Sequence, residues 1–79
     1  MTKSIYPEDY LKRFRESIGD SIKGARERKG FSQEQLAEIM GIQRSTISKI
    51  ETGRFAISVD YLIKFAWHLD FEVLISQKN

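Results

Sequence analysis

Apolar side chains recur at steps of three and four residues along most of the chain, the spacing that places them on one face of a helix. The first stripe consists of Leu11, Phe14, Ile18, Ile22 and Ala25. Pro7 suits the first turn of this helix, because its missing N–H needs no partner there, and Gly30 suits its end. Gly19 lowers helix stability by up to about 1 kcal/mol relative to alanine. The pattern predicts a helix between Pro7 and Gly30, with Gly19 as the point where it can break.

Three shorter helices are predicted after Gly30. Ser32 stands three residues before Gln35, the capping-box spacing in which each side chain satisfies the other's free backbone N–H. Gly41 ends this second helix, and the third extends from about Gln43 to Thr52. The fourth is predicted from its cap and its apolar stripe: Ser58, Leu62, Phe65, Ala66 and Leu69.

The period of the pattern changes after the fourth helix. In residues 71–76, Phe71, Val73 and Ile75 alternate with their neighbours, which is typical of a β-strand. A single strand leaves its backbone groups unpaired, and no other segment of the chain has a strand pattern. We therefore expect pairing with the same strand of a second copy. The alternative is a frayed helix end that packs on the core.

Residues 32–53 have the residue types that a helix-turn-helix unit requires. Ala37 is small where two helices cross closely, and Gly41 permits the positive φ of a short turn between helices. Apolar residues that hold the two helices at a fixed angle occupy the inward positions: Leu36, Met40, Ile42, Ile47 and Ile50. Polar residues fill the positions between them. This pattern predicts a helix-turn-helix unit, whose second helix enters the major groove of DNA.

Composition and charge narrow the class of protein. The chain has 79 residues, enough for one small domain, and its 13 basic and 11 acidic residues give a net charge of +2. This modest surplus permits nucleic acid as a partner without requiring it. Cysteine is absent, which excludes a disulfide framework and thiolate-bound zinc. Domains of this size bury a modest share of their surface, which favours a dimer.

Targeting, membrane and catalytic signals are also missing. The apolar run at residues 73–75 is far shorter than the roughly 20 residues of a membrane span, and the N-terminus lacks a signal-peptide pattern. His68 is the only histidine, and no histidines or carboxylates have the spacing of a metal site. The five glycines stand singly and form no phosphate-binding loop. We expect a cytoplasmic protein without enzymatic activity, metal or cofactor.

The central part of the chain resembles the phage-repressor and Cro type of helix-turn-helix proteins, the XRE group. The resemblance is carried by Arg26, Gly30-Phe31-Ser32-Gln33, Leu36-Ala37, Gly41, Glu51-Thr52-Gly53 and Leu62-Ile63-Lys64-Phe65-Ala66. Two positions depart from it: Ile57 stands where many relatives have proline, and Asp70 where many have glycine. It implies an all-α, compact four- to five-helix lambda-repressor-like DNA-binding domain over residues 18–69.

The ends of the chain extend beyond this domain. Residues 1–17 are expected to form a helical N-terminal extension. Residues 70–79 resemble the ending of small antitoxin repressors of the HipB kind, whose strands pair across a dimer. This second resemblance implies that the dimerisation strand contributes Phe71, Val73 and Ile75 to the contact.

The docking geometry of these proteins assigns candidate DNA contacts. Early residues of the second helix of the unit face base edges, and here they are Gln43, Arg44, Ser45, Thr46 and Lys49. Arg44 is the first candidate, because its guanidinium can pair with O6 and N7 of guanine together. Phosphate contacts are expected at the start of the preceding helix and just after the recognition helix, from Ser32, Gln33 and Arg54.

Glu51 has a different predicted role. It follows Ile47 on one helix face and should be partly buried, where a carboxylate needs a partner. The resemblance implies that Arg26 is this partner, in a structural ion pair that orients the recognition helix.

The predicted function is a sequence-specific repressor that binds a palindromic operator on double-stranded DNA as a homodimer. Its two recognition helices would lie about 34 Å apart, one turn of the duplex. The resemblance of the tail adds a second role, an antitoxin that also binds a cognate toxin protein. The alternative is a helix-turn-helix module used for protein–protein contacts without specific DNA binding.

Overall fold

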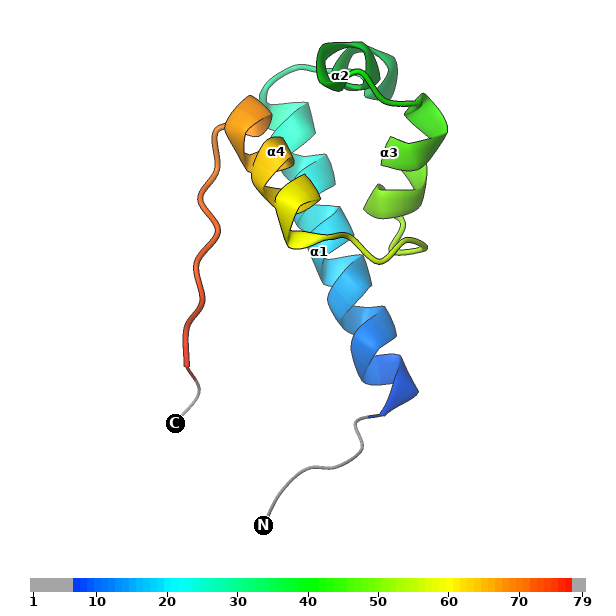
Figure 1. The fold of residues 1–79 in the computed structure, drawn as a ribbon, viewed down its shortest axis with the longest axis vertical. Coiled ribbons are helices and arrows are strands. Elements are labelled where there is room, and N and C mark those ends of the chain that lie inside the picture. Colours follow the sequence, from blue (N-terminus) through cyan, green and yellow to red (C-terminus); the bar gives the residue numbers. More distant parts are fainter. Residues whose placement is uncertain (1–6, 78–79) are drawn as a thin grey trace.

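The computed structural model describes residues 7–77, so the first six residues of the expected N-terminal extension and the last two of the tail lie outside it. The described part contains four α-helices and no strand. Their bounds are α1 Glu8–Arg28, α2 Gln33–Met40, α3 Arg44–Glu51 and α4 Val59–Leu69 (Figure 1). The all-α class predicted from the sequence is confirmed.

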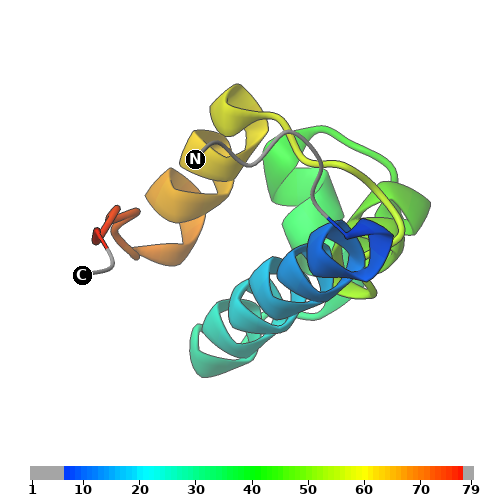
Figure 2. The same cartoon turned by 90° about the horizontal axis from the view of Figure 1, so that it is seen from below.

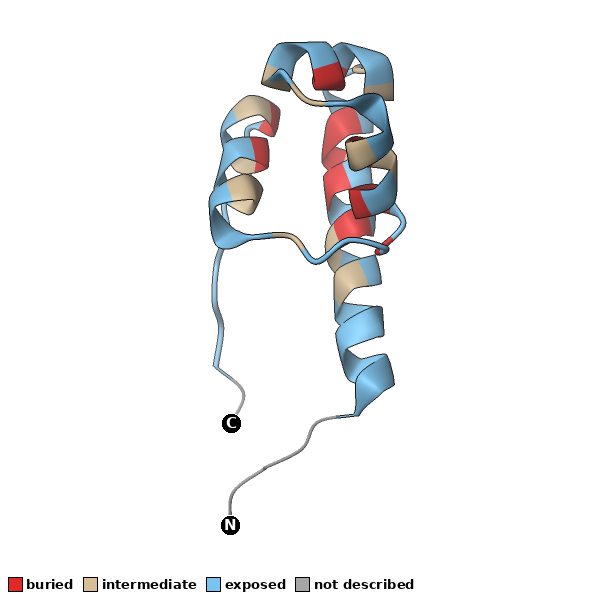
Figure 3. Ribbon diagram, turned by 45° about the vertical axis from the view of Figure 1, so that its right-hand side comes forward, coloured by how far each residue is buried: buried red, intermediate tan, exposed pale blue. Residues whose placement is uncertain are grey.

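The first helix, α1, is a single helix of 21 residues. It does not break at Gly19, and it crosses the boundary that the sequence placed between residues 17 and 18. The described part of the N-terminal extension is therefore continuous with the domain, and its N-terminal turns project beyond the other helices (Figures 1 and 3). Neither α1 nor any other helix of residues 7–77 combines the length and the apolar character needed to cross a bilayer.

Local side-chain caps determine where α2 and α4 begin. The backbone N–H of Gln35 donates to Oγ of Ser32 over 3.0 Å, and the backbone N–H of Ser32 donates to Oε1 of Gln35 over 2.8 Å. This is the predicted capping box. At α4, the backbone N–H of Tyr61 donates to Oγ of Ser58 over 3.1 Å. Both caps satisfy donors that the first turn of a helix leaves free.

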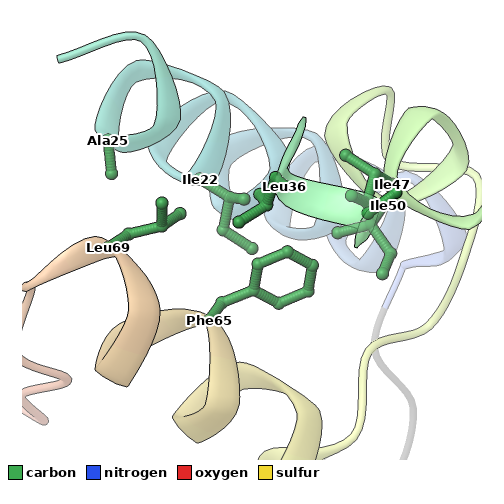
Figure 4. Packing of buried hydrophobic residues seen from close by; sticks show 8 residues of the cluster. Ile22, Ala25, Leu36, Ile47, Ile50, Phe65 and Leu69 are labelled. Atoms are coloured by element: carbon green, nitrogen blue, oxygen red, sulfur yellow. The ribbon is translucent and has the colours of Figure 1, made fainter. Parts of the chain in front are cut away.

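The hydrophobic core lies where the inner faces of all four helices meet (Figures 3 and 4). Each helix contributes two buried apolar residues: Ile22 and Ala25, Leu36 and Ala37, Ile47 and Ile50, and Phe65 and Leu69. The first part of the apolar stripe on α1 does not reach this core. Leu11 and Phe14 are exposed, because they lie in the turns of α1 that project beyond the domain.

The C-terminal tail leaves α4 through Asp70, which has the left-handed backbone conformation (φ 56°). The family resemblance leads to the expectation of glycine at this position, and glycine adopts such a φ at no steric cost. Residues 71–77 form neither helix nor strand, so the predicted strand is not present in the single chain. Strand hydrogen bonds need a partner segment, and residues 7–70 are helices and connecting loops. Pairing across a dimer stays a prediction.

Candidate nucleic-acid interface

The helices α2 and α3 form a helix-turn-helix unit. Gly41 ends α2 with a φ of 67°, and the backbone N–H of Ile42 returns to the carbonyl oxygen of Ala37 over 3.0 Å. Gln43 stands before the first turn of α3 as its N-cap, with extended backbone. The positive φ that the turn requires is thus supplied by Gly41, as the sequence predicted.

Most of the predicted base-reading side chains lie on the open side of α3. Gln43, Arg44, Ser45 and Lys49 are exposed, and Thr46 is half-buried. Nε of Arg44 lies 3.7 Å from Oε2 of Glu34, but both side chains are largely in solvent, so this contact holds Arg44 only weakly. Ser45 Oγ donates to Oε1 of Gln43 over 3.4 Å. These side chains can therefore rearrange to meet a ligand at little cost.

The opposite side of α3 carries a buried ion pair. Nε of Arg26 donates to Oε2 of Glu51 over 2.7 Å, and Nη2 of Arg26 donates to Oε1 over 3.1 Å. Nη1 of the same guanidinium donates to the carbonyl oxygen of Phe31 over 2.7 Å. The Glu51 side chain is 2% exposed, and its hydrogen bond raises the pKa of Arg26 above the ordinary value, so the guanidinium stays charged. The pair joins α1 to the end of α3 in a defined geometry, since a bidentate contact has a narrow range of orientations.

Gln33, predicted as a phosphate contact, is tied to the same network. Its Nε2 donates to Oε1 of Glu51 over 3.0 Å. A side-chain amide has two N–H groups, so the second remains available to a phosphate oxygen. The start of α2, where Ser32 and Gln33 lie, is thereby coupled to the orientation of α3. Arg54, the third predicted phosphate contact, is exposed just after α3.

Two glycines let α1 approach α3 closely, a contact that the sequence pattern did not predict. A Cβ at Gly19 would lie 2.5 Å from the carbonyl oxygen of Ile50 and 2.6 Å from that of Glu51. A Cβ at Gly53, which has a φ of 76°, would lie 2.9 Å from Cα of Glu16. The only signal in the sequence is a glycine inside a helical pattern. This signal could not show which backbone segment the glycine contacts.

The predicted dimerisation residues differ in their surroundings. Phe71 is half-buried against the core of its own chain, so part of its apolar surface is already covered. Val73 and Ile75 are exposed. The single chain therefore leaves two of the three predicted side chains open for contact with a second copy.

Comparison with known proteins agrees with this geometry. Residues 22–72 match the helix-turn-helix family. The chain belongs to the helix-turn-helix family. A Pyrococcus furiosus protein named as an HTH-type transcriptional regulatory protein is 33% identical to this helix-turn-helix chain over 46 residues, which are 58% of the chain and 15% of that protein. The chain thus spans a small part of that relative's length.

A solved structure extends the comparison to three dimensions. The restriction-modification controller protein C.AhdI from Aeromonas hydrophila superposes on this helix-turn-helix chain with a TM-score of 0.71 and 33% sequence identity. The match covers 76% of this chain and 91% of C.AhdI. The family match and these two relatives agree with the helix-turn-helix unit predicted from the sequence.

Proposed function

We propose that this chain is a sequence-specific DNA-binding repressor that acts as a homodimer on a palindromic operator. The observation that carries the proposal is the two-sided construction of α3. Its open side presents Arg44, Ser45 and Lys49, while its buried side is anchored to α1 by the Arg26–Glu51 pair. A rigidly held helix with an exposed polar face is what sequence reading requires, because base contacts demand a fixed position in the groove.

In this proposal α3 enters the major groove with its N-terminal end toward the bases. Arg44 is the principal base contact, and its guanidinium exchanges the weak contact with Glu34 for a guanine edge. Gln43, Ser45, Thr46 and Lys49 complete the reading surface. Lys49 lies with Nζ 5.0 Å from the centre of the Phe55 ring, a contact that limits the directions in which its side chain extends.

Phosphate contacts fix the register of α3 without reading sequence. Ser32 and Gln33 lie at the start of α2, where free backbone N–H groups and the helix dipole favour an anion. Arg54 lies beyond the other end of α3 and provides a second anchor. A phosphate bound by Gln33 would also act on α3, because the amide is already hydrogen-bonded to Glu51.

Selection from a randomised duplex pool at near-physiological salt tests this proposal. We expect an enriched palindrome with half-sites about one helical turn apart. On that site, Arg44→Ala should lose about 1–3 kcal/mol of binding free energy and relax the preference at one base pair. Lys64→Ala is the matched control: it removes one exposed positive charge from α4, on the other side of the domain from α3.

The outcomes separate this function from its alternative. Enrichment that Lys64→Ala retains and Arg44→Ala changes at one position supports base reading by α3. If the folded protein enriches no sequence, the helix-turn-helix unit serves protein–protein contacts instead. Equal losses from both variants on every sequence would show binding through general charge, which contradicts specific recognition.

The antitoxin role is a further part of the proposal. An exposed apolar surface on the projecting turns of α1 offers a place for a toxin protein: Tyr10, Leu11 and Phe14. Co-expression with the product of an adjacent gene, followed by co-purification, tests it. A complex that Phe14→Lys abolishes while operator binding is retained supports the antitoxin role. A failure of the two proteins to associate contradicts it.

A further inference from the structure

The outer face of α4 carries an apolar stripe that the DNA-binding role does not use. Val59, Ile63 and Trp67 are 71%, 55% and 80% exposed. They follow one another at steps of four residues, so they lie along one side of the helix. Tryptophan is usually highly buried in folded proteins, which makes its exposure here unusual.

The position of this stripe follows from the core. Phe65 is fully buried, and Ile63 and Trp67 each stand two residues away from it. Two residues correspond to about 200° around a helix of 3.6 residues per turn, so both side chains point away from the core. Because Phe65 faces inward, the stripe faces outward. The helix that carries it, α4, lies on the side of the molecule opposite α3 (Figures 1 and 2).

We propose that the stripe of Val59, Ile63 and Trp67 packs against the same stripe of a second copy, with the two α4 helices antiparallel about a twofold axis at Ile63. The inference deepens the proposed function, because it rests on the homodimer and assigns its seam. It places the main contact on α4, and the tail residues Val73 and Ile75 extend it.

The stripe is self-complementary, as the interface of a twofold dimer must be. Val59 and Trp67 stand four residues before and after Ile63. An antiparallel pair centred on Ile63 therefore sets Ile63 against itself and the small Val59 against the large Trp67. A shallow, open hollow lies next to Trp67, lined by Ile63, Ala66, Asp70, Phe71 and Glu72. The Val59 side chain of the second copy would enter this hollow.

The area of the stripe suits part of a dimer interface. Burial of one tryptophan and two aliphatic side chains removes on the order of 300–400 Å² from water on each copy. A standard interface buries about 800 Å² per partner. The stripe thus supplies nearly half, and the start of the tail lines the same hollow and continues the surface.

This seam also gives the recognition helices a suitable separation. Half of the required spacing of about 34 Å, roughly 17 Å, must separate each α3 from the twofold axis. The molecule measures 23 Å across its intermediate axis, the horizontal direction of Figure 1, with α4 and α3 on opposite sides. Joining two copies through α4 leaves both α3 helices on the outer parts of the dimer.

Single cysteines test the seam, since the chain has none of its own. Helix axes 8–10 Å apart bring facing Cα atoms to roughly 3.5–5.5 Å, which overlaps the disulfide range. Under mild oxidation, Ile63→Cys should form a covalent dimer in most of the protein. Phe14→Cys is the control, because Phe14 is 54% exposed, much like Ile63 at 55%, and lies on the projecting part of α1.

A mixture of Val59→Cys and Trp67→Cys proteins tests the antiparallel direction. We expect a disulfide between the two variants and little in either variant alone. A strong disulfide in Val59→Cys alone would show parallel helices and overturn the arrangement. Trp67→Lys should weaken dimerisation at least about tenfold, because large buried aromatic residues often dominate interface energies. Phe14→Lys should leave dimerisation unchanged.

Light scattering of the unmodified protein separates the two proposals. A protein that stays monomeric alone and on DNA contradicts the homodimeric repressor, and the seam with it. A dimer in which Ile63→Cys forms no more disulfide than Phe14→Cys overturns the α4 seam alone and leaves the homodimer standing. Thermal unfolding at low concentration, where both proteins are monomeric, should be the same for Trp67→Lys and the unmodified protein. This result ensures that a loss of dimerisation does not reflect a loss of folding.

Discussion

Alanine at Gly19 and alanine at Gly24 should change the stability of this protein in opposite directions, although both residues lie inside α1. In a helix interior, glycine is less favourable than alanine by up to about 1 kcal/mol. A comparison based on helix propensity alone would therefore expect both substitutions to stabilise the protein. The surroundings of the two positions differ, and that difference should decide whether each substitution raises or lowers the free energy of unfolding.

A Cβ at position 24 needs only a small shift of one flexible side chain. Its nearest neighbour in the structure is Nη1 of Arg28, 3.3 Å away at the end of a flexible side chain. Gly24→Ala should therefore gain about 0.5–1 kcal/mol in the free energy of unfolding. For a domain of this size, the melting temperature should rise by about 2–8 °C.

The Cβ at position 19 has no room. It would lie 2.5 Å from the carbonyl oxygen of Ile50 and 2.8 Å from the carbonyl carbon of Glu51, and both belong to backbone. The contact reaches 3.0 Å only if α3 moves away by roughly half an ångström. Overpacking costs about 1–3 kcal/mol, and a clash with two backbone carbonyl groups falls in the upper part of this range. After subtraction of a propensity gain of about 1 kcal/mol, Gly19→Ala should lose about 1–2 kcal/mol overall.

Thermal unfolding followed by circular dichroism measures both variants, at one protein concentration because dimerisation shifts the apparent stability. The free energies of unfolding of the two variants should differ by about 1.5–3 kcal/mol. Gly19→Ala should also lose operator affinity while it is still folded, since α3 is displaced from its position. If Gly19→Ala melts at or above the temperature of the unmodified protein, the close crossing of α1 and α3 is not what positions the recognition helix.

Four other expectations follow from the structure. Arg26→Met should lower the free energy of unfolding in urea by about 3–5 kcal/mol, because it leaves Glu51 buried without its partner. The double variant Arg26→Met with Glu51→Leu should recover most of this loss. An equal loss in the single and the double variant would argue against the ion pair as the cause. Gln33→Ala should weaken binding to all duplexes by a similar factor, and a loss confined to one sequence would refute a phosphate role. Ser58→Ala should cost about 1 kcal/mol of stability through its lost cap, and an unchanged melting temperature would show that the cap is dispensable. Asp70→Gly should raise stability by up to about 1–2 kcal/mol, because glycine adopts the left-handed backbone conformation of residue 70 without the steric cost that aspartate has. A lower melting temperature would show that the ion pair of Asp70 with Lys29 contributes more than this steric cost.

Much of the fold could be predicted because it depends on neighbours in the sequence. The capping box of Ser32 and Gln35 and the turn at Gly41 are made by residues within a few positions of one another. The apolar spacing identified all eight buried core residues, since helical periodicity determines which side chains share a face. The pairing of Arg26 with Glu51 came from resemblance, because no local pattern relates residues 25 positions apart.

The sequence predicted less well the features that depend on contacts between segments far apart in the chain. It assigned Leu11 and Phe14 to the same stripe as Ile22, yet only Ile22 reaches the core, because α1 is longer than the helices that cover it. It predicted a strand at residues 71–76, but a strand needs a partner that the single chain does not provide.

The sequence by itself determined the helices, their caps, the turn between α2 and α3 and the polar character of the recognition helix. These features arise from the spacing of residue types within a few turns of one chain segment. Only the tertiary structure decided that Gly19 is a contact between α1 and the backbone of α3, that Gln33 joins the buried ion pair, and that Trp67 lies in the open. Each of these depends on how the helices cross, which is determined by the packing of side chains from all four helices at once.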